Sequence, residues 1–95
     1  MQATSNAYGN AVADRIRAQW ALPSFLQSQN LHATIIIHLD GHGNVVAMEF
    51  TRVSGNTLFD NYAEGAIRRS SPLPPPPVEL APSLRRVGME VGFPL

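Results

Sequence analysis

Three histidines are the residues best suited to bind a metal ion in this 95-residue chain, which contains no cysteine. His32 and His38 lie six positions apart in a segment with strand-like alternation, so they would stand about 20 Å apart and cannot share an ion. His38, Asp40 and His42 cluster around a predicted turn, but structural zinc sites need four ligands. Polar residues on the exposed face of a hairpin explain these positions better, so we expect no metal and no cofactor.

Nucleophilic and acid–base catalysis also lack a sequence signature. The chain contains seven serines, but none lies in the Gly-x-Ser-x-Gly pattern of a nucleophile elbow. The seven carboxylates are scattered, and only Glu49 lies in an apolar stretch, where alternation directs it outward. Residues 41–43 (Gly-His-Gly) lack the third glycine and the following helix of a phosphate-binding loop. We therefore expect a binding module rather than an enzyme.

Composition narrows the class of protein further. A net charge of zero offers no attraction to a polyanion, which argues against nucleic-acid binding. Apolar residues make up 44% of the chain and charged residues 15%, a balance typical of a folded globular domain. The longest apolar run, over residues 33–37 and interrupted by Thr34, is far shorter than the roughly 20 residues needed to cross a bilayer. We expect a disordered N-terminus over residues 1–5 and one domain over residues 6–95.

The first part of the chain predicts an amphipathic helix over residues 6–21. Apolar residues recur there every four positions, a spacing that lines one face of a helix: Tyr8, Val12, Ile16 and Trp20. Pro23 disfavours helical geometry at the residue before it and should end the helix. Tyr8 and Trp20 are therefore assigned to the core rather than to a ligand-stacking surface.

A β-hairpin is predicted next, with strands over residues 31–39 and 45–53. Residues 40–44 (Asp-Gly-His-Gly-Asn) join the strands and tolerate positive φ angles. In the first strand, the odd-numbered residues from Ala33 to Leu39 are expected to face the core. The expected inward residues of the second strand are Val46, Met48 and Phe50. Val45 and Val53 do not fit that alternation.

A second helix is predicted over residues 57–69, with Thr57 as its N-cap and Asp60 near the positive end of its dipole. Its expected buried residues are Phe59, Ala63, Ala66 and Ile67. The proline-rich segment over residues 71–78 lacks the amide donors that a helix or central strand requires, so it must cross the domain in an extended form. From Val87 to Phe93, apolar residues alternate with polar residues or glycines, which predicts a last strand with one buried face.

The element order α-β-β-α-β makes the predicted fold class α+β. Its simplest solution is a three-stranded antiparallel sheet with two helices packed on one face. Such a sheet has two edges, and no other predicted element can cover both. The last strand has no proline before Pro94, so its backbone amides should remain available. An open edge of this kind can receive a partner strand.

In its order of motifs the sequence resembles the C-terminal domain of the TonB/TolA family. The resembling motifs are Tyr8, Trp20 and Pro23 of the first helix, the Asp-Gly-x-Gly-x-Val hairpin within residues 35–46, Ser54-Gly55 ahead of an acidic-capped helix, the proline-rich crossing over 72–77, and Gly92-Phe93 in the last strand. Together they span residues 8–93. The Tyr-Pro pair and the aromatic-rich ending of many iron-uptake TonB proteins are missing, which favours TolA-like or divergent TonB-like members.

The resemblance implies a periplasmic domain of a protein anchored in the bacterial inner membrane, with the anchor and a long linker ahead of residue 1. Family members work with a proton-driven inner-membrane motor of the ExbB–ExbD or TolQ–TolR type. They pass force to an outer-membrane receptor or a periplasmic adaptor, and they bind an extended peptide of that partner by strand addition. The resemblance implies neither a cofactor nor a nucleic-acid partner.

In the family the last strand usually receives the partner, so the resemblance also implies a set of binding residues. They are Leu84, Arg85, Arg86, Val87, Gly88, Met89, Glu90 and Val91. The charges of Arg85, Arg86 and Glu90 are expected to tune partner choice. Proline at Gly88 or Glu90 is expected to weaken binding without unfolding the core. The alternative is a self-associating scaffold domain, because open edges can pair into a homodimer.

Overall fold

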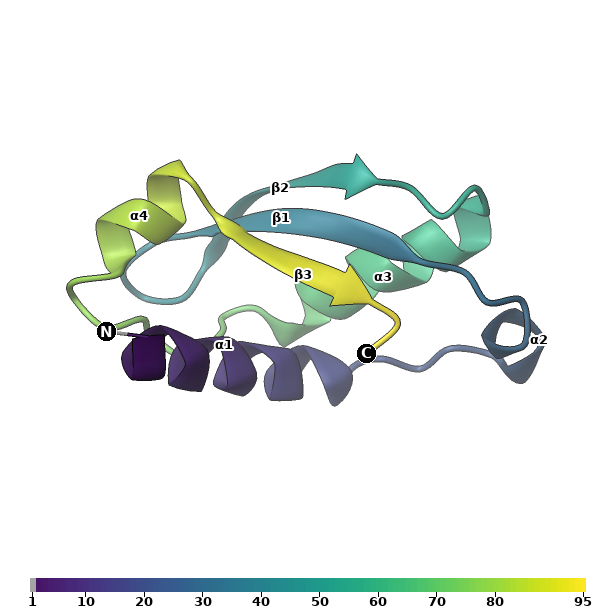
Figure 1. Cartoon of the computed structure of the whole chain (residues 1–95), viewed down its shortest axis with the longest axis horizontal. Coiled ribbons are helices and arrows are strands. Elements are labelled where there is room, and N and C mark those ends of the chain that lie inside the picture. The colour runs from purple at the N-terminus through teal and green to yellow at the C-terminus, as the bar shows by residue number, and fades with distance from the viewer. Residues whose placement is uncertain (1) are drawn as a thin grey trace.

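The structure, a computed structural model, describes residues 2–95 of the chain, with side chains from residue 7 onward. Its elements are α1 (Gln2–Arg17), α2 (Ser24–Gln27), β1 (Ala33–Leu39), β2 (Val45–Arg52), α3 (Thr57–Ser70), α4 (Ala81–Arg86) and β3 (Met89–Phe93). The three strands form one antiparallel sheet in the order β2-β1-β3, and α1 and α3 lie beneath it (Figure 1). This confirms the predicted α+β arrangement, to which α2 and α4 are additions.

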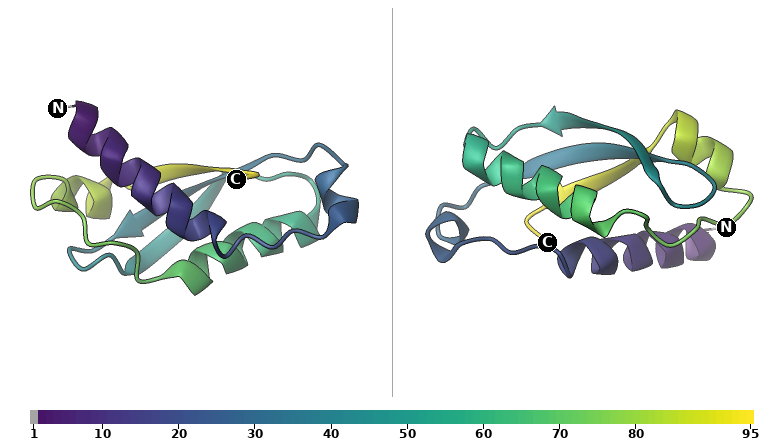
Figure 2. Two further views of the ribbon diagram at one scale, coloured as in Figure 1. Left: turned by 90° about the horizontal axis from the view of Figure 1, so that it is seen from below. Right: turned by 180° about the vertical axis from the view of Figure 1, so that it is seen from behind.

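The two long helices cover the same face of the sheet. In the view from below, both α1 and α3 lie in front of the strands (Figure 2, left). In the view from behind, both helices again lie below the sheet (Figure 2, right). The short helix α4 lies at one end of the sheet, where Gly88 approaches the side chain of Ile36 on the opposite face. Of the described residues, those at the end of α4 cover part of this opposite face, where the Arg85 carbonyl oxygen lies 3.1 Å from Nδ1 of His38.

The first helix is confirmed, but its bounds are shifted by four residues towards the N-terminus. It begins at Gln2, inside the segment predicted to be disordered, and ends at Arg17 instead of residue 21. After the helix ends, the next residues form a tighter turn with hydrogen bonds between residues three apart. The backbone N–H of Gln19 donates to the carbonyl oxygen of Ile16, and that of Trp20 to the carbonyl oxygen of Arg17 (2.9 and 3.0 Å). Pro23 then serves as the N-cap residue of α2.

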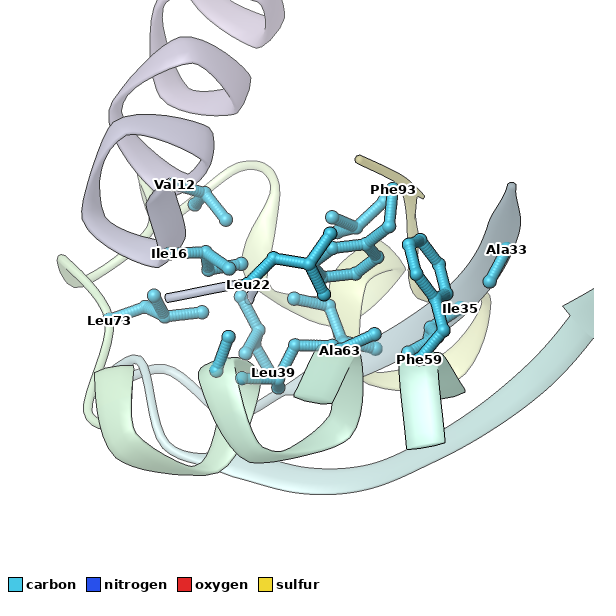
Figure 3. Close-up of a cluster of buried hydrophobic side chains, with 14 of the residues drawn as sticks. Val12, Ile16, Leu22, Ala33, Ile35, Leu39, Phe59, Ala63, Leu73 and Phe93 are labelled. Atoms are coloured by element: carbon cyan, nitrogen blue, oxygen red, sulfur yellow. The ribbon is translucent and has the colours of Figure 1, made fainter. Parts of the chain in front are cut away.

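The core lies between the sheet and the two long helices, as the patterns predicted. The odd-numbered residues of β1 are at most 1% exposed: Ala33, Ile35, Ile37 and Leu39. Val12 and Ile16 of α1 meet Ala63 of α3 and Leu39 in this layer (Figure 3). The other predicted core residues of both helices are buried too, except Trp20, which is half-buried. The Trp20 ring packs edge-on against Phe59, with ring centroids 5.7 Å apart.

The inward residues of β2 correct the prediction. Leu39 pairs with Val45 and the preceding residue, His38, with Ala47, so Val46 is an extra residue in a β-bulge. The bulge exposes 47% of Val46 and lets Val45 pack against the core beside Met48 and Phe50. Strict alternation across residues 45–50 therefore failed, because one residue stands outside the pleat.

The start of α3 is capped by Asn56, which corrects the assignment of Thr57. The Asn56 side chain accepts from the backbone N–H groups of Leu58 and Phe59 (3.0 and 3.1 Å). Asp60, in the first turn, accepts from the backbone N–H of Ser54 (3.1 Å) and so fixes the turn that precedes the helix. Both acceptors satisfy amide donors that would otherwise lack partners.

The proline-rich segment contains no helix or strand from residue 71 to residue 77, as predicted. The N–H of Leu73 donates to the carbonyl oxygen of Gly43 in the hairpin turn (2.8 Å). The Tyr8 hydroxyl of α1 donates to the carbonyl oxygen of Pro74 (2.7 Å), and burial raises the pKa of this hydroxyl. The segment therefore ties α1 and the hairpin together at one end of the domain.

Candidate partner-binding edge of the sheet

The two edges of the sheet differ in regularity. Strand β2 carries two register shifts against β1, one beside Val46 and the other beside Thr51. Strand β3 pairs with β1 at five consecutive positions, from Met89 to Phe93, without a shift. Bulges twist an edge strand and disturb its row of donors and acceptors, which discourages pairing. The edge of β3 is therefore the one that can accept a further strand in regular register.

The pleat of the sheet determines which backbone groups of β3 face outward. The N–H of Asp40 donates to the carbonyl oxygen of Asn44 in the hairpin (3.1 Å), so even-numbered residues of β1 face β2. Odd-numbered residues consequently face β3, where their partners are Met89, Val91 and Phe93. The backbone groups of Glu90 and Gly92 are left at the outer edge, where a partner strand would find them.

A groove of about 150 Å³ follows this edge between β3 and α1. Its lining residues are Gly9, Val12, Ala13, Met89, Glu90, Val91, Gly92 and Leu95. A strand laid beside β3 would direct alternate side chains towards this groove and the others towards the open face of the sheet. The edge thus offers hydrogen-bonding groups and an apolar recess together.

No part of the described structure suggests a metal centre. Residues 7–95 contain no group of three histidine, aspartate or glutamate side chains that could hold an ion. The Asp40 carboxylate instead accepts from the Asn44 side chain and from the backbone N–H groups of Asn44 and His42, and these hydrogen bonds lower its pKa. No helix within the described residues is long and apolar enough to span a membrane.

The comparison with known families agrees with the resemblance inferred from the motif order. A sequence model of the TonB C-terminal region matches residues 5–92. The chain belongs to the TonB C-terminal family. Its fold is also similar to the solution NMR structure of TolAIII bound to a peptide derived from the N-terminus of TolB, with a TM-score of 0.64. That match covers 88% of this chain and 68% of TolAIII at 20% identity, a level that establishes the shared fold alone. No curated protein sequence matches the chain.

The structure divides the predicted binding residues of this TonB C-terminal domain between three segments. Leu84, Arg85 and Arg86 belong to α4 rather than to the last strand, and Val87 and Gly88 form the turn that follows. The remaining three residues, Met89, Glu90 and Val91, lie in β3. Pro82 explains the difference, because proline favours the first turn of a helix and the periodicity of residues 87–93 does not mark where the strand begins.

The predicted effect of proline at Gly88 also needs correction. Gly88 has a φ of +89°, and proline fixes φ near about −65°. A Cβ at this position would lie 2.5 Å from Cγ2 of Ile36 and 2.9 Å from the carbonyl oxygen of Ile37. Proline at Gly88 would therefore disturb the fold itself. Glu90 remains suitable for this test, because its N–H faces outward and proline is tolerated on such an edge.

Charges of both signs flank the candidate edge. Glu90 is exposed on the open face and forms no ion pair with the side chains of residues 7–95. Arg85 and Arg86 are exposed at the end of α4, just before β3 begins. The His38 ring holds this end in place, with Nδ1 3.1 Å from the Arg85 carbonyl oxygen and Nε2 3.3 Å from the Glu49 carboxylate.

Proposed function

We propose that this domain binds an extended segment of an outer-membrane receptor or periplasmic adaptor by adding it as a fourth strand beside β3. The observation that carries the proposal is the regular outer edge of β3, with the backbone groups of Glu90 and Gly92 directed outward. In strand addition, main-chain hydrogen bonds supply affinity and alternate side chains supply specificity. Family membership and a fold shared with the peptide-bound TolAIII support this mode of binding.

The wider role proposed for the domain follows from the TonB/TolA resemblance. The domain would lie in the periplasm and act as the distal end of an energy transducer anchored in the inner membrane. A proton-driven motor of the ExbB–ExbD or TolQ–TolR type would generate force, and the docked strand would pass that force to the partner. In this role the domain binds and transmits, and it needs no catalytic group or cofactor.

Titration of the ¹⁵N-labelled domain with synthetic peptides tests the proposal. The peptides would be the extended N-terminal segments of candidate outer-membrane receptors and of Tol-type periplasmic partners. We expect saturable amide shifts over Met89–Phe93 and unshifted amides along the outer edge of β2. The peptide that binds would also identify the pathway served.

A matched pair of variants isolates the backbone contribution. Glu90→Pro removes the outward N–H, whereas Glu90→Gln keeps it and removes only the charge. We expect the proline variant to raise the peptide Kd about tenfold and the glutamine variant to change it far less. Equal binding by the proline variant and the parent would show that the partner does not pair with this edge.

A homodimer is the competing use of the same edge, because two β3 strands can pair about a two-fold axis. Sedimentation equilibrium of the free domain separates the two functions. A concentration-dependent dimer mass, together with no shifts from any peptide, would replace partner binding by a scaffold role.

A further inference from the structure

A pocket of about 410 Å³ opens at the end of the sheet where β3 finishes and β1 begins. Its apolar wall includes Trp20 and Leu22 from the segment after α1, Leu26 from α2, and Phe59 from α3. Leu22 and Phe59 project towards the same apolar region in the close-up of the core (Figure 3). Folding therefore brings apolar surface from several distant segments to one opening.

The side chains of residues 7–95 leave this pocket open. Trp20 is fixed on one side by Phe59 and by Phe93, whose ring centroid lies 4.9 Å from that of Trp20, yet the indole remains half-buried. The opening is a surface cleft rather than a void in the core, and its volume falls within the roughly 300–1,000 Å³ typical of binding pockets.

The pocket adjoins the groove along the candidate edge. Leu95 lines both the pocket and the groove between α1 and β3. A segment that pairs with β3 and continues past Phe93 would therefore reach Leu95 and then the mouth of the pocket. At about 3.3 Å per residue, the four positions from Val91 to Leu95 span at most about 13 Å, because the strand ends at Phe93. By about the same rise, a side chain of the partner segment that lies two to four residues beyond its last paired residue would reach the pocket.

The chemistry of the lining selects an uncharged occupant. Among the residues whose side chains the structure describes, no Asp, Glu, Lys or Arg lines the pocket, and the polar side chains there are Gln27, Asn30 and His32. Gln27 already donates its side-chain N–H to the carbonyl oxygen of Leu22 (2.8 Å). The charged groups of the candidate edge, Arg85, Arg86 and Glu90, lie in α4 and in β3 and are absent from this lining. A large apolar side chain would gain the most by leaving water here.

We propose that the Trp20 pocket anchors one large aliphatic or aromatic side chain of the same partner segment that pairs with β3. The inference rests on the proposed strand addition and extends it. The partner's footprint then has two parts: a backbone part along Glu90 and Gly92, and a side-chain part at the pocket. The second part adds to specificity, because backbone pairing alone does not distinguish sequences.

The experiment uses the fact that Trp20 is the only tryptophan in the chain. A phage library of random 12-residue peptides would be selected on the domain, and the best binder would be synthesised and titrated into ¹⁵N-labelled protein. One spectrum then reports the Glu90 and Gly92 amides and the single indole N–H together. We expect all three to shift with one Kd. Replacing one apolar peptide residue by serine should abolish the indole shift and raise Kd about tenfold.

A pair of protein variants tests the pocket from the other side. His32 is exposed and lies at the pocket, so His32→Asp adds a carboxylate there, and His32→Asn is the uncharged control. We expect only the aspartate variant to weaken binding, because the incoming apolar group would desolvate its charge.

Each other outcome has a definite meaning. Shifts at Glu90 and Gly92 without an indole shift would refute the pocket and leave strand addition standing. An indole shift without edge shifts would show an independent pocket and refute the two-part footprint. Failure to enrich any binder would count against strand addition itself, and the pocket proposal would fall with it.

Discussion

Replacing Gly43 by alanine should destabilise the domain more than any other glycine substitution in the hairpin. Gly43 is buried, has a φ of +89°, and accepts from the N–H of Leu73 through its carbonyl oxygen. A Cβ on Gly43 would lie 2.0 Å from the Leu73 carbonyl oxygen and 3.1 Å from that of Pro74. These neighbours are backbone atoms, so no side-chain rotation relieves the clash. The crossing segment would have to move away from the hairpin to which it is hydrogen-bonded.

The magnitude follows from three separate costs. A non-glycine residue at positive φ costs about 1–2 kcal/mol. Displacing a packed segment, as in other overpacked cores, costs about 1–3 kcal/mol. The hydrogen bond between Leu73 and Gly43 contributes about 1 kcal/mol when it is lost. The sum, about 3–6 kcal/mol, is a large share of the roughly 5–15 kcal/mol that stabilises a typical domain.

Urea denaturation followed by circular dichroism measures this loss against two controls in the same chain. Gly41 has no heavy atom within 4 Å of a built Cβ, so Gly41→Ala should change the free energy of unfolding by less than about 0.5 kcal/mol. Gly55 has a φ of +91° but open space around it, so Gly55→Ala should show the backbone cost alone, about 1–2 kcal/mol. If Gly43→Ala costs no more than Gly55→Ala, the crossing segment is not held against the hairpin as described.

Three further substitutions test local contacts. Asn56→Ala should lower the free energy of unfolding by about 1 kcal/mol in urea denaturation, with exposed Asn61→Ala as the control, because two N–H groups at the start of α3 lose their acceptor. Hydrogen bonds lower the folded-state pKa of Asp40, so their stabilisation is present above the unfolded pKa of about 4 and is lost as pH falls through the lower folded value. Asp40→Asn should therefore flatten the acid limb of stability against pH, and an unchanged limb would contradict this. Tyr8→Phe should cost about 1 kcal/mol at neutral pH, because the Pro74 carbonyl loses its donor. Burial raises the pKa of Tyr8, so the parent should lose stability above about pH 10 where the variant does not, and identical alkaline limbs would refute that assignment.

The sequence predicted correctly those elements whose apolar residues follow one regular period and pack against one layer of the core. β1 is the central strand, with a neighbour on each side, so its alternation translates directly into one fully buried face. The apolar stripes of α1 and α3 likewise face a single layer. In these elements local periodicity and tertiary packing agree, and the prediction succeeds for that reason.

The parts that it missed depend on contacts between distant segments. The bulge at Val46 changes which residues of β2 face the core, and alternation cannot encode an extra residue. Helix α4 has only six residues, too few to be stable alone, and it is held in part by the contact between His38 and the Arg85 carbonyl oxygen. Of the eight predicted binding residues, the last three therefore lie in β3, and the first five lie in α4 and the turn after it. The Trp20 pocket is built from segments up to 75 positions apart, which no local pattern reveals.

The inequality of the two sheet edges also limits polymerisation. Two domains that joined through β3 would form a continuous six-stranded sheet. Because the strand order in each half is β2-β1-β3, both edge strands of that sheet would be β2. Both edge strands would then carry the bulges beside Val46 and Thr51, and a bulged strand pairs poorly with a strand of a third domain. Association would stop at the dimer, because each domain has one edge that pairs readily and the dimer uses both of these edges. A domain with two regular edges would instead propagate into a fibre.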